Sequence, residues 1–261
     1  FGPMVGGLFA HPDAGPVGFR IPLFLASGLA ALCVVAIAVF IKESRVREQA
    51  ITHRPSRWAA ISDAVNHPVI GRLMLLTFLV GFAFTGIEST FGLWSQAKFG
   101  WGPREIGVCF AFTGAAAALT QTFLTGRLSE KYGAGKMLAI GMGLTVVAAA
   151  GQTLSPGGGV TIALMCLTAI GQSVAWPNVS AMISQTADPY RQGQILGLNN
   201  ATGALARVIG PFCAGLIFPV LLDGPFIMGA LVVAPAIFLA LAASRRAAAQ
   251  LAADKTPAPT S

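Results

Sequence analysis

Two ionisable side chains lie inside long apolar stretches of this chain of 261 residues. Glu88 lies within the stretch 70–95, and Arg207 lies within the stretch 195–218. An ionised group is costly in hydrocarbon, so both should face the protein interior or a water-filled cavity. A carboxyl group held in such a place can exchange a proton, which is the chemistry of a proton-coupled carrier. The alternative is a structural carboxylate hydrogen-bonded to Ser89 or Thr90.

Arg207 is the only cation inside a predicted span once Arg72, at the edge of 70–95, is counted with the loop before it, and Glu88 is the only acid at membrane depth. Because a buried cation needs a partner, we hypothesise that the two residues pair. A partner on a segment outside this chain is an equally open alternative.

Polar and aromatic residues gather within the stretch 160–183. Trp176 offers an apolar π surface, neighbouring amides offer hydrogen bonds, and Pro177 predicts a kink, a mixture that suits amphipathic aromatic ligands. Polar residues also hold helices together with no ligand involved, and this alternative stays open. The candidate residues of a substrate cavity are Gln121, Gln172, Trp176, Asn178, Asn199 and Asn200.

The residue types needed for enzymatic or metal chemistry are poorly placed. The histidines (His11, His53 and His67) all lie in predicted loops, and the four cysteines are widely separated within apolar runs. This pattern favours neither a metal nor a haem site. No Gly-rich phosphate-binding loop occurs, which argues against direct coupling to ATP. We expect no enzyme, no metal and no cofactor.

The composition excludes an ordinary soluble domain. Hydrophobic residues make up 54% of the chain and charged residues only 10%, against roughly 25% charged residues in an average soluble domain. The mean hydropathy is +0.70. The net charge of +7 comes from basic residues between apolar runs, which indicates membrane orientation and not a nucleic-acid partner. Because the runs are unbroken and not alternating, they predict helices that cross a lipid bilayer.

Seven stretches are long and apolar enough to span the hydrocarbon, and residues 1–10 are predicted to be the tail of an eighth. The predicted spans are 21–41, 70–95, 105–126, 137–156, 160–183, 195–218 and 225–243.

The distribution of Lys and Arg predicts the orientation of these spans. If the long connection 42–69 is cytoplasmic, thirteen of the 17 cations lie on that side and three on the other, and the remaining one is Arg207. This excess predicts a cytoplasmic C-terminus.

An internal repeat indicates how the spans are organised. The element Gly2-Pro3-x-x-Gly6-Gly7 recurs as Gly210-Pro211-x-x-Ala214-Gly215, and in both places a loop and a Pro-led span follow. Residues 1–45 therefore resemble 210–246, although such strings also arise by chance in Gly-rich helices. We interpret the chain as a fragment lacking roughly 140 N-terminal residues of a two-fold repeated protein. Its expected parts are 1–41, the last two spans of an N-terminal half with the first truncated; 42–69, a cytoplasmic linker; 70–243, a complete six-span half; and 244–261, a cytoplasmic tail.

Three regions resemble the major facilitator superfamily, in particular its multidrug and tetracycline drug:proton antiporters. They are the Gly-Pro element at residues 2–7, the charged stretch 126–136, and residues 87–91 with the turn and helix start at 99–107. The resemblance implies an all-α helical bundle that exports small molecules by alternating access. It assigns conformational roles to Gly2, Pro3, Gly6, Gly7, Gly126, Arg127, Glu130, Lys131, Gly133, Lys136, Gly210 and Pro211.

Each of these motifs also has a plainer interpretation. A carboxylate in the charged stretch can pair in only one of two rocking states, but the same charges also serve membrane topology alone. The Gly-Pro elements can equally be packing contacts. The expected partners are a small-molecule substrate, protons, lipid and the missing N-terminal spans, and the expected location is a bacterial inner membrane. The alternatives are proton-coupled uptake of a metabolite on the same fold, a non-transporting receptor and an intramembrane enzyme.

Overall fold

The computed structural model describes residues 20–40, 57–188 and 191–254, and within these ranges every regular element is a helix. The all-α fold expected from the sequence is confirmed. The helices are α2 (Arg20–Phe40), α3 (Arg57–Asn66), α4 (Ile70–Phe99), α5 (Pro103–Leu119), the π-helix η2 (Thr120–Thr125), α6 (Gly126–Tyr132), α7 (Ala134–Thr153), α8 (Gly158–Thr186), α9 (Gln192–Ile217) and α10 (Gly224–Asp254).

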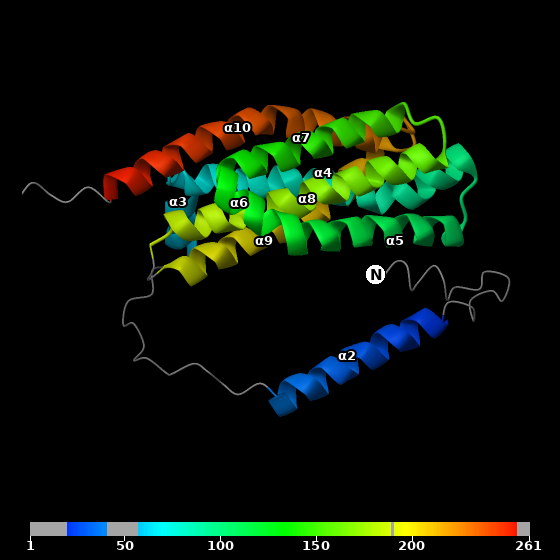
Figure 1. Cartoon of the computed structure of the whole chain (residues 1–261), viewed down its shortest axis with the longest axis horizontal. Helices are drawn as coiled ribbons and strands as arrows, with labels where there is room; N and C mark the ends of the chain where they lie inside the picture. The colour runs from blue at the N-terminus through cyan, green and yellow to red at the C-terminus, as the bar shows by residue number, and fades with distance from the viewer. Residues whose placement is uncertain (1–19, 41–56, 189–190, 255–261) are drawn as a thin grey trace, which may run out of the picture.

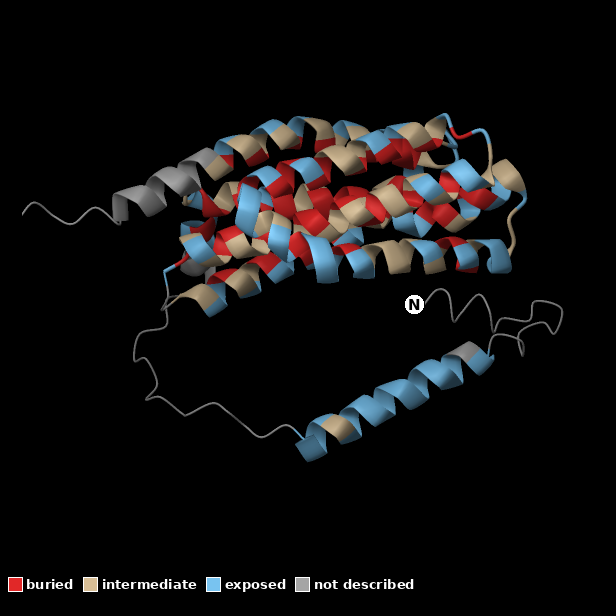
Figure 2. Cartoon of the chain, viewed as in Figure 1, coloured by how far each residue is buried: buried red, intermediate tan, exposed pale blue. Residues whose placement is uncertain are grey.

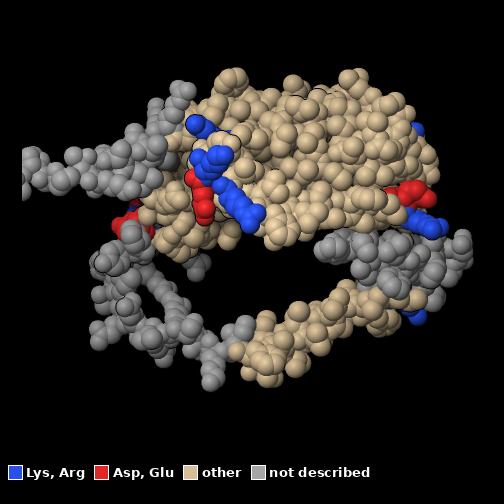
Figure 3. Space-filling model, viewed as in Figure 1, with Lys and Arg blue, Asp and Glu red and all other residues tan. Residues whose placement is uncertain are grey.

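Seven helical segments within the described ranges are long and apolar enough to cross a membrane, and each predicted span falls on one of them. One of these helical segments, Pro103–Tyr132, runs without a break through α5, η2 and α6. Helix α10 continues to Asp254, past the predicted boundary at 243. On the face seen in Figure 3, charged residues gather towards the two ends of the molecule and leave an uncharged middle, as a bilayer requires.

Six of these helical segments form a bundle, and α2 lies apart from it (Figure 1). Nearly all of α2 is exposed, as Figure 2 shows by its pale blue colour. Because its span is strongly apolar and carries no charge, yet is uncovered, lipid or another protein segment must cover it in a membrane. The motif residues Gly2, Pro3, Gly6 and Gly7 lie outside the described residues, as does most of the first helix pair in the predicted repeat.

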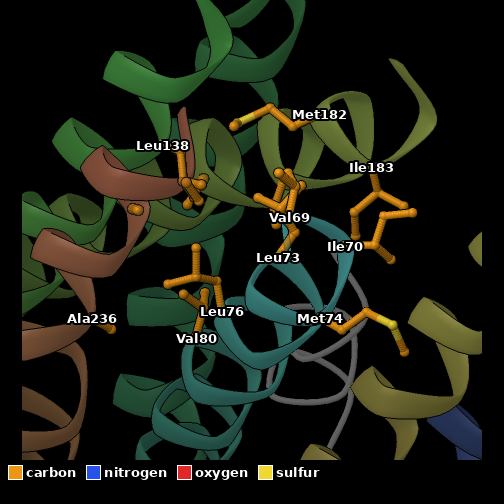
Figure 4. Packing of buried hydrophobic residues seen from close by; sticks show 14 of the residues in the cluster. Val69, Ile70, Leu73, Met74, Leu76, Val80, Leu138, Met182, Ile183 and Ala236 are labelled. Atoms are coloured by element: carbon orange, nitrogen blue, oxygen red, sulfur yellow. The ribbon is translucent and has the colours of Figure 1, made fainter. Parts of the chain in front are cut away.

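The largest core cluster joins α4, α7, α8 and α10 (Figure 4). Leu73, Leu76, Leu138 and Ile183 are completely buried within it. Lipid tails are as apolar as these side chains, so the helices gain little from the hydrophobic effect by meeting one another. Close van der Waals packing must hold them together instead.

Glycines provide this close packing at two helix pairs. A Cβ atom added to Gly141 of α7 would lie 2.5 Å from the carbonyl oxygen of Gly171 on α8. One added to Gly210 of α9 would lie 2.5 Å from the carbonyl oxygen of Phe82 on α4. Both pairs therefore meet backbone to backbone, which fits the packing interpretation of the Gly210-Pro211 element.

A polar cluster joins three helices at the end of the bundle where α4 and α7 terminate and α10 begins. Lys98 donates hydrogen bonds to the carbonyl oxygens of Gln152 (3.3 Å) and Thr153 (3.1 Å) at the end of α7. Its Nζ also lies 3.6 Å from Oδ1 of Asp223. The same carboxylate accepts a 2.7 Å hydrogen bond from the indole Nε1 of Trp94. We call Trp94, Lys98 and Asp223 the Lys98 clamp.

Replacing Asp223 by Asn and by Ala distinguishes the contribution of the Lys98–Asp223 ion pair from that of the Trp94–Asp223 hydrogen bond. We expect Asp223→Asn to lower the free energy of unfolding by less than about 1 kcal/mol, because the ion pair is partly exposed. Asp223→Ala should cost about 1–3 kcal/mol more, because the fully buried Trp94 then loses its hydrogen-bond partner. Unfolding in mixed detergent micelles measures both values, and equal losses in the two variants would contradict this account.

Candidate functional site

The bundle contains a cavity of about 640 Å³ between α4, α5, η2, α8 and α9. Most of its wall is apolar or small. Side chains that can carry charge or form hydrogen bonds line it from all five elements. Those with a charged, amide or indole group are Glu88, Gln121, Gln172, Trp176 and Arg207, and the hydroxyl groups come from Thr85, Thr113, Thr168 and Ser173. A volume of this size holds a drug-sized molecule.

Glu88 on α4 and Arg207 on α9 line the same cavity, and both are exposed to it. The contact ion pairs among the described residues are Lys98–Asp223 and Arg191–Asp63, and Glu88 and Arg207 do not form one. The structure therefore brings the two charges together without closing a salt bridge between them. Both can respond to a third charged group that enters the cavity.

The neighbouring hydroxyl groups do not hold Glu88. The Oγ of Ser89 donates to the carbonyl oxygen of Gly86 at 3.0 Å, and the Oγ1 of Thr90 donates to the same oxygen at 2.9 Å. Both bonds lie within α4 itself. Within the described residues, the Glu88 carboxylate is thus left without these two partners, which weakens its interpretation as a structural carboxylate.

Two other cavity residues present groups suited to ligand contacts. The guanidinium of Arg207 lies 6.0 Å from the ring centroid of Trp176, within the range of a cation–π interaction. The amide nitrogen of Gln172 is buried and has no hydrogen-bond partner among the described residues. Buried polar groups are nearly always paired, so this amide is a candidate donor to a bound molecule or water.

The three asparagines among the candidate residues do not line this cavity. Asn178 is buried, and its amide donates to the carbonyl oxygen of Val174 at 2.7 Å, within its own helix. Asn199 is buried elsewhere in α9, and Asn200 is exposed. The structure therefore brings together Gln121, Gln172 and Trp176 and leaves the asparagines apart.

Sequence reasoning missed the π-helix η2, which carries Gln121 into the cavity wall. The Oγ1 of Thr125 donates to the carbonyl oxygen of Thr120 at 3.1 Å and to that of Ser173 on α8 at 3.2 Å. Single π-turns inside α-helices are frequent at functional sites. The spacing of five between the two threonines was the available signal, but it is too common in helices to be predictive.

Sequence reasoning also missed the apolar and hydroxyl residues of the cavity wall. They have the same residue types as helix interfaces and lipid-facing surfaces, so no local signal separates them. They include Phe84, Thr85, Phe110, Thr113, Met165 and Thr168.

The charged stretch forms helix α6 and the start of α7. Its charged side chains are exposed, and none of them forms an ion pair within the described part of the chain. Gly133 separates the two helices with a φ of 88°, a conformation that L residues adopt only under strain. The charges and Gly126 thus stand at a sharp helix–helix turn, where they are free to meet another segment. The charged residues are Arg127, Glu130, Lys131 and Lys136.

Comparison with known proteins decides the family. The sequence model of the Major Facilitator Superfamily matches residues 1–157 and 73–260, which together cover nearly the whole chain. The chain belongs to the Major Facilitator Superfamily. Its membrane helices therefore belong to an integral membrane protein of this superfamily.

Relatives of this major facilitator chain include two resistance proteins. It is 26% identical to multidrug resistance protein 2 of Bacillus subtilis over 88% of its own length and 57% of the relative. It is 24% identical to the class C tetracycline resistance protein of Escherichia coli over 83% of its length and 54% of the relative. The chain thus spans little more than half the length of these proteins.

A solved structure supports the fold independently. The human organic anion transporter MFSD10 (TETRAN) superposes with a TM-score of 0.69 at 20% sequence identity, covering 91% of this chain and 66% of that one. At this identity the likeness concerns the fold alone.

Proposed function

We propose that this chain is the C-terminal part of a proton-coupled transporter that exports small amphipathic molecules or drugs by alternating access. The observation that carries the proposal is Glu88, a carboxylate at membrane depth in the wall of a cavity large enough for such a molecule. The similarity to multidrug and tetracycline resistance proteins supports the same direction of transport. The proposal involves no covalent chemistry and therefore no enzymatic activity.

In this proposal the chain combines parts of two halves. Residues 1–41 are the last spans of the first half, 42–69 the linker, 70–243 the second half and 244–261 a cytoplasmic tail. The N-terminal spans that complete the cavity are a partner within the same protein, and lipid surrounds both halves. The distribution of cations supports a cytoplasmic C-terminus, and the bacterial relatives support an inner-membrane location.

The mechanism follows from competition for one carboxylate. When Glu88 is ionised, it favours a cationic or dipolar substrate in the cavity, and when it is protonated, that attraction is lost. Arg207, which lines the same cavity, repels a proton or a cationic substrate. When no substrate is bound, its positive charge can stabilise the ionised form of Glu88. If substrate and proton bind alternately while the two halves rock about the cavity, the proton gradient drives export.

Reconstitution of the full-length protein into liposomes tests the proposal. With an imposed pH gradient, we expect a fluorescent cationic dye or a tetracycline to accumulate on the proton-rich side. One pH unit supplies about 1.4 kcal/mol per proton, enough for about tenfold accumulation with one proton exchanged. Fluorescence of the trapped compound measures the ratio.

The side on which the substrate accumulates distinguishes proton-coupled export from proton-coupled uptake. Antiport moves the substrate against the flow of protons, whereas symport of a metabolite moves both the same way. Collapse of the gradient with a protonophore is the control, and it should abolish accumulation. Accumulation on the proton-poor side would support the uptake alternative, and a ratio that stays at one for drugs and metabolites alike would contradict both forms of transport.

A further inference from the structure

The indole ring of Trp176 lies in a slot formed by two glycines on different helices. A Cβ atom added to Gly203 of α9 would lie 3.2 Å from Cη2 and 3.5 Å from Cζ2 of the ring. A Cβ atom added to Gly81 of α4 would first meet Cβ of Ala206 at 3.2 Å and would lie at an ordinary contact distance, 3.5 Å, from Cζ3 of the ring. The benzene edge of the indole therefore packs beside both glycines, and at Gly203 it lies closer than a side chain would allow without a shift.

The opposite edge of the ring is not held in this way. The indole N–H of Trp176 makes no hydrogen bond within the described residues, although the side chain is half-buried and lines the cavity. The guanidinium of Arg207 lies over the ring. By contrast, the N–H of the buried Trp94 is bonded to Asp223. Trp176 is thus anchored by its apolar edge and keeps its polar edge available.

We propose that Gly203 is a specificity-determining positioning residue that acts through Trp176. Its lack of a side chain sets how deeply the ring enters the slot, and hence the width of the cavity between Trp176 and Glu88. This inference rests on the proposed function, because it concerns which substrates the same cavity accepts. The ligands that it discriminates are flat, multi-ring aromatic cations, since their stacking depends on ring position.

A methyl group at position 203 should push the ring towards the cavity. The 3.2 Å separation is tighter than an ordinary van der Waals contact, so the ring must move by a few tenths of an ångström. A flat polycyclic ligand that fills the remaining width loses contact area or clashes, whereas a small ligand does not. Gly203→Ala should therefore weaken binding of the planar dye ethidium about tenfold, and that of benzyltrimethylammonium by less than about twofold.

Equilibrium binding to the purified full-length protein in detergent measures both dissociation constants. Isothermal titration needs no pH gradient, so a failure of proton-driven transport leaves this measurement intact. The matched control is Gly197→Ala on the same helix, where an added Cβ meets nothing within 4 Å. Both constants should stay within about twofold of wild type in this control. An equal change for the two ligands in Gly203→Ala would overturn the proposal.

A double-mutant cycle tests whether Gly203 acts through the ring. Phe is too short to reach the bottom of the slot, so in a Trp176→Phe background the methyl group at position 203 has no ring atom to displace. We expect Gly203→Ala to change ethidium binding by less than about twofold in that background. The same tenfold loss there would mean that Gly203 acts through packing of α4 against α9, and it would remove Trp176 from the inference.

Discussion

Substituting Glu88 by Gln in the full-length transporter should reduce pH-gradient-driven accumulation from about tenfold to a ratio of one. Gln is nearly isosteric and resembles the protonated acid, so the cavity keeps its shape. It cannot ionise, however, so the coupling between proton and substrate is lost even if the substrate is still transported at the same rate. Liposomes with an imposed gradient measure the ratio, while exchange of labelled substrate without a gradient should persist.

Glu105→Gln is the matched control, because it makes the same chemical change at the other acid of the α4–α5 region. Glu105 is exposed at the start of α5, where Oε2 accepts a 2.9 Å hydrogen bond from the backbone nitrogen of Gly102. The amide oxygen of Gln can replace that acceptor, and the residue does not line the cavity. Accumulation should stay at the wild-type ratio. A Glu88→Gln protein that retained full gradient-driven accumulation would remove Glu88 from the mechanism.

A single methyl group at Gly141 should destabilise the bundle by about 1–3 kcal/mol. The added Cβ would lie 2.5 Å from the carbonyl oxygen of Gly171 and 2.9 Å from the backbone nitrogen of Ala175. Neither is a flexible side chain, so α7 and α8 must separate along their shared interface. Close packing is the principal attraction between helices in lipid, so little else offsets that loss. The free energy of unfolding in mixed micelles measures the effect.

Gly143→Ala provides the comparison on the same helix. An added Cβ there meets nothing within 4 Å, and Ala favours a helix over Gly by up to about 1 kcal/mol. This variant should therefore be as stable as the wild type or more so, which gives the two substitutions opposite signs. Equal behaviour of the two variants would show that the backbone contact between α7 and α8 contributes nothing to stability.

Much of the fold could be predicted from the sequence because crossing a bilayer is a local requirement. A span needs enough consecutive apolar residues, and each of the seven predicted stretches became one of the membrane-length helices. The same reasoning singled out Glu88 and Arg207, since a charge at that depth must avoid lipid. Both residues line one cavity in the structure.

The identity of the residues that face the cavity was decided by the tertiary structure. Gln172 and Asn178 lie on the same helix and have the same amide chemistry, yet Gln172 lines the cavity and Asn178 bonds its own helix. In a soluble helix the apolar stripe would show which face is buried. Here lipid and protein interior are equally apolar, so the pattern of apolar residues carries no such information.

Contacts between segments that are distant in the sequence could likewise not be predicted from the sequence. Lys98 and Asp223 meet because α4 ends where α10 begins, and Trp176 enters a slot whose two glycines lie on α4 and α9. Membrane insertion depends on the transfer free energy of each segment by itself, which the sequence determines. The clamp, the cavity and the slot depend on which faces of the helices meet, and only close packing of the whole bundle selects those faces.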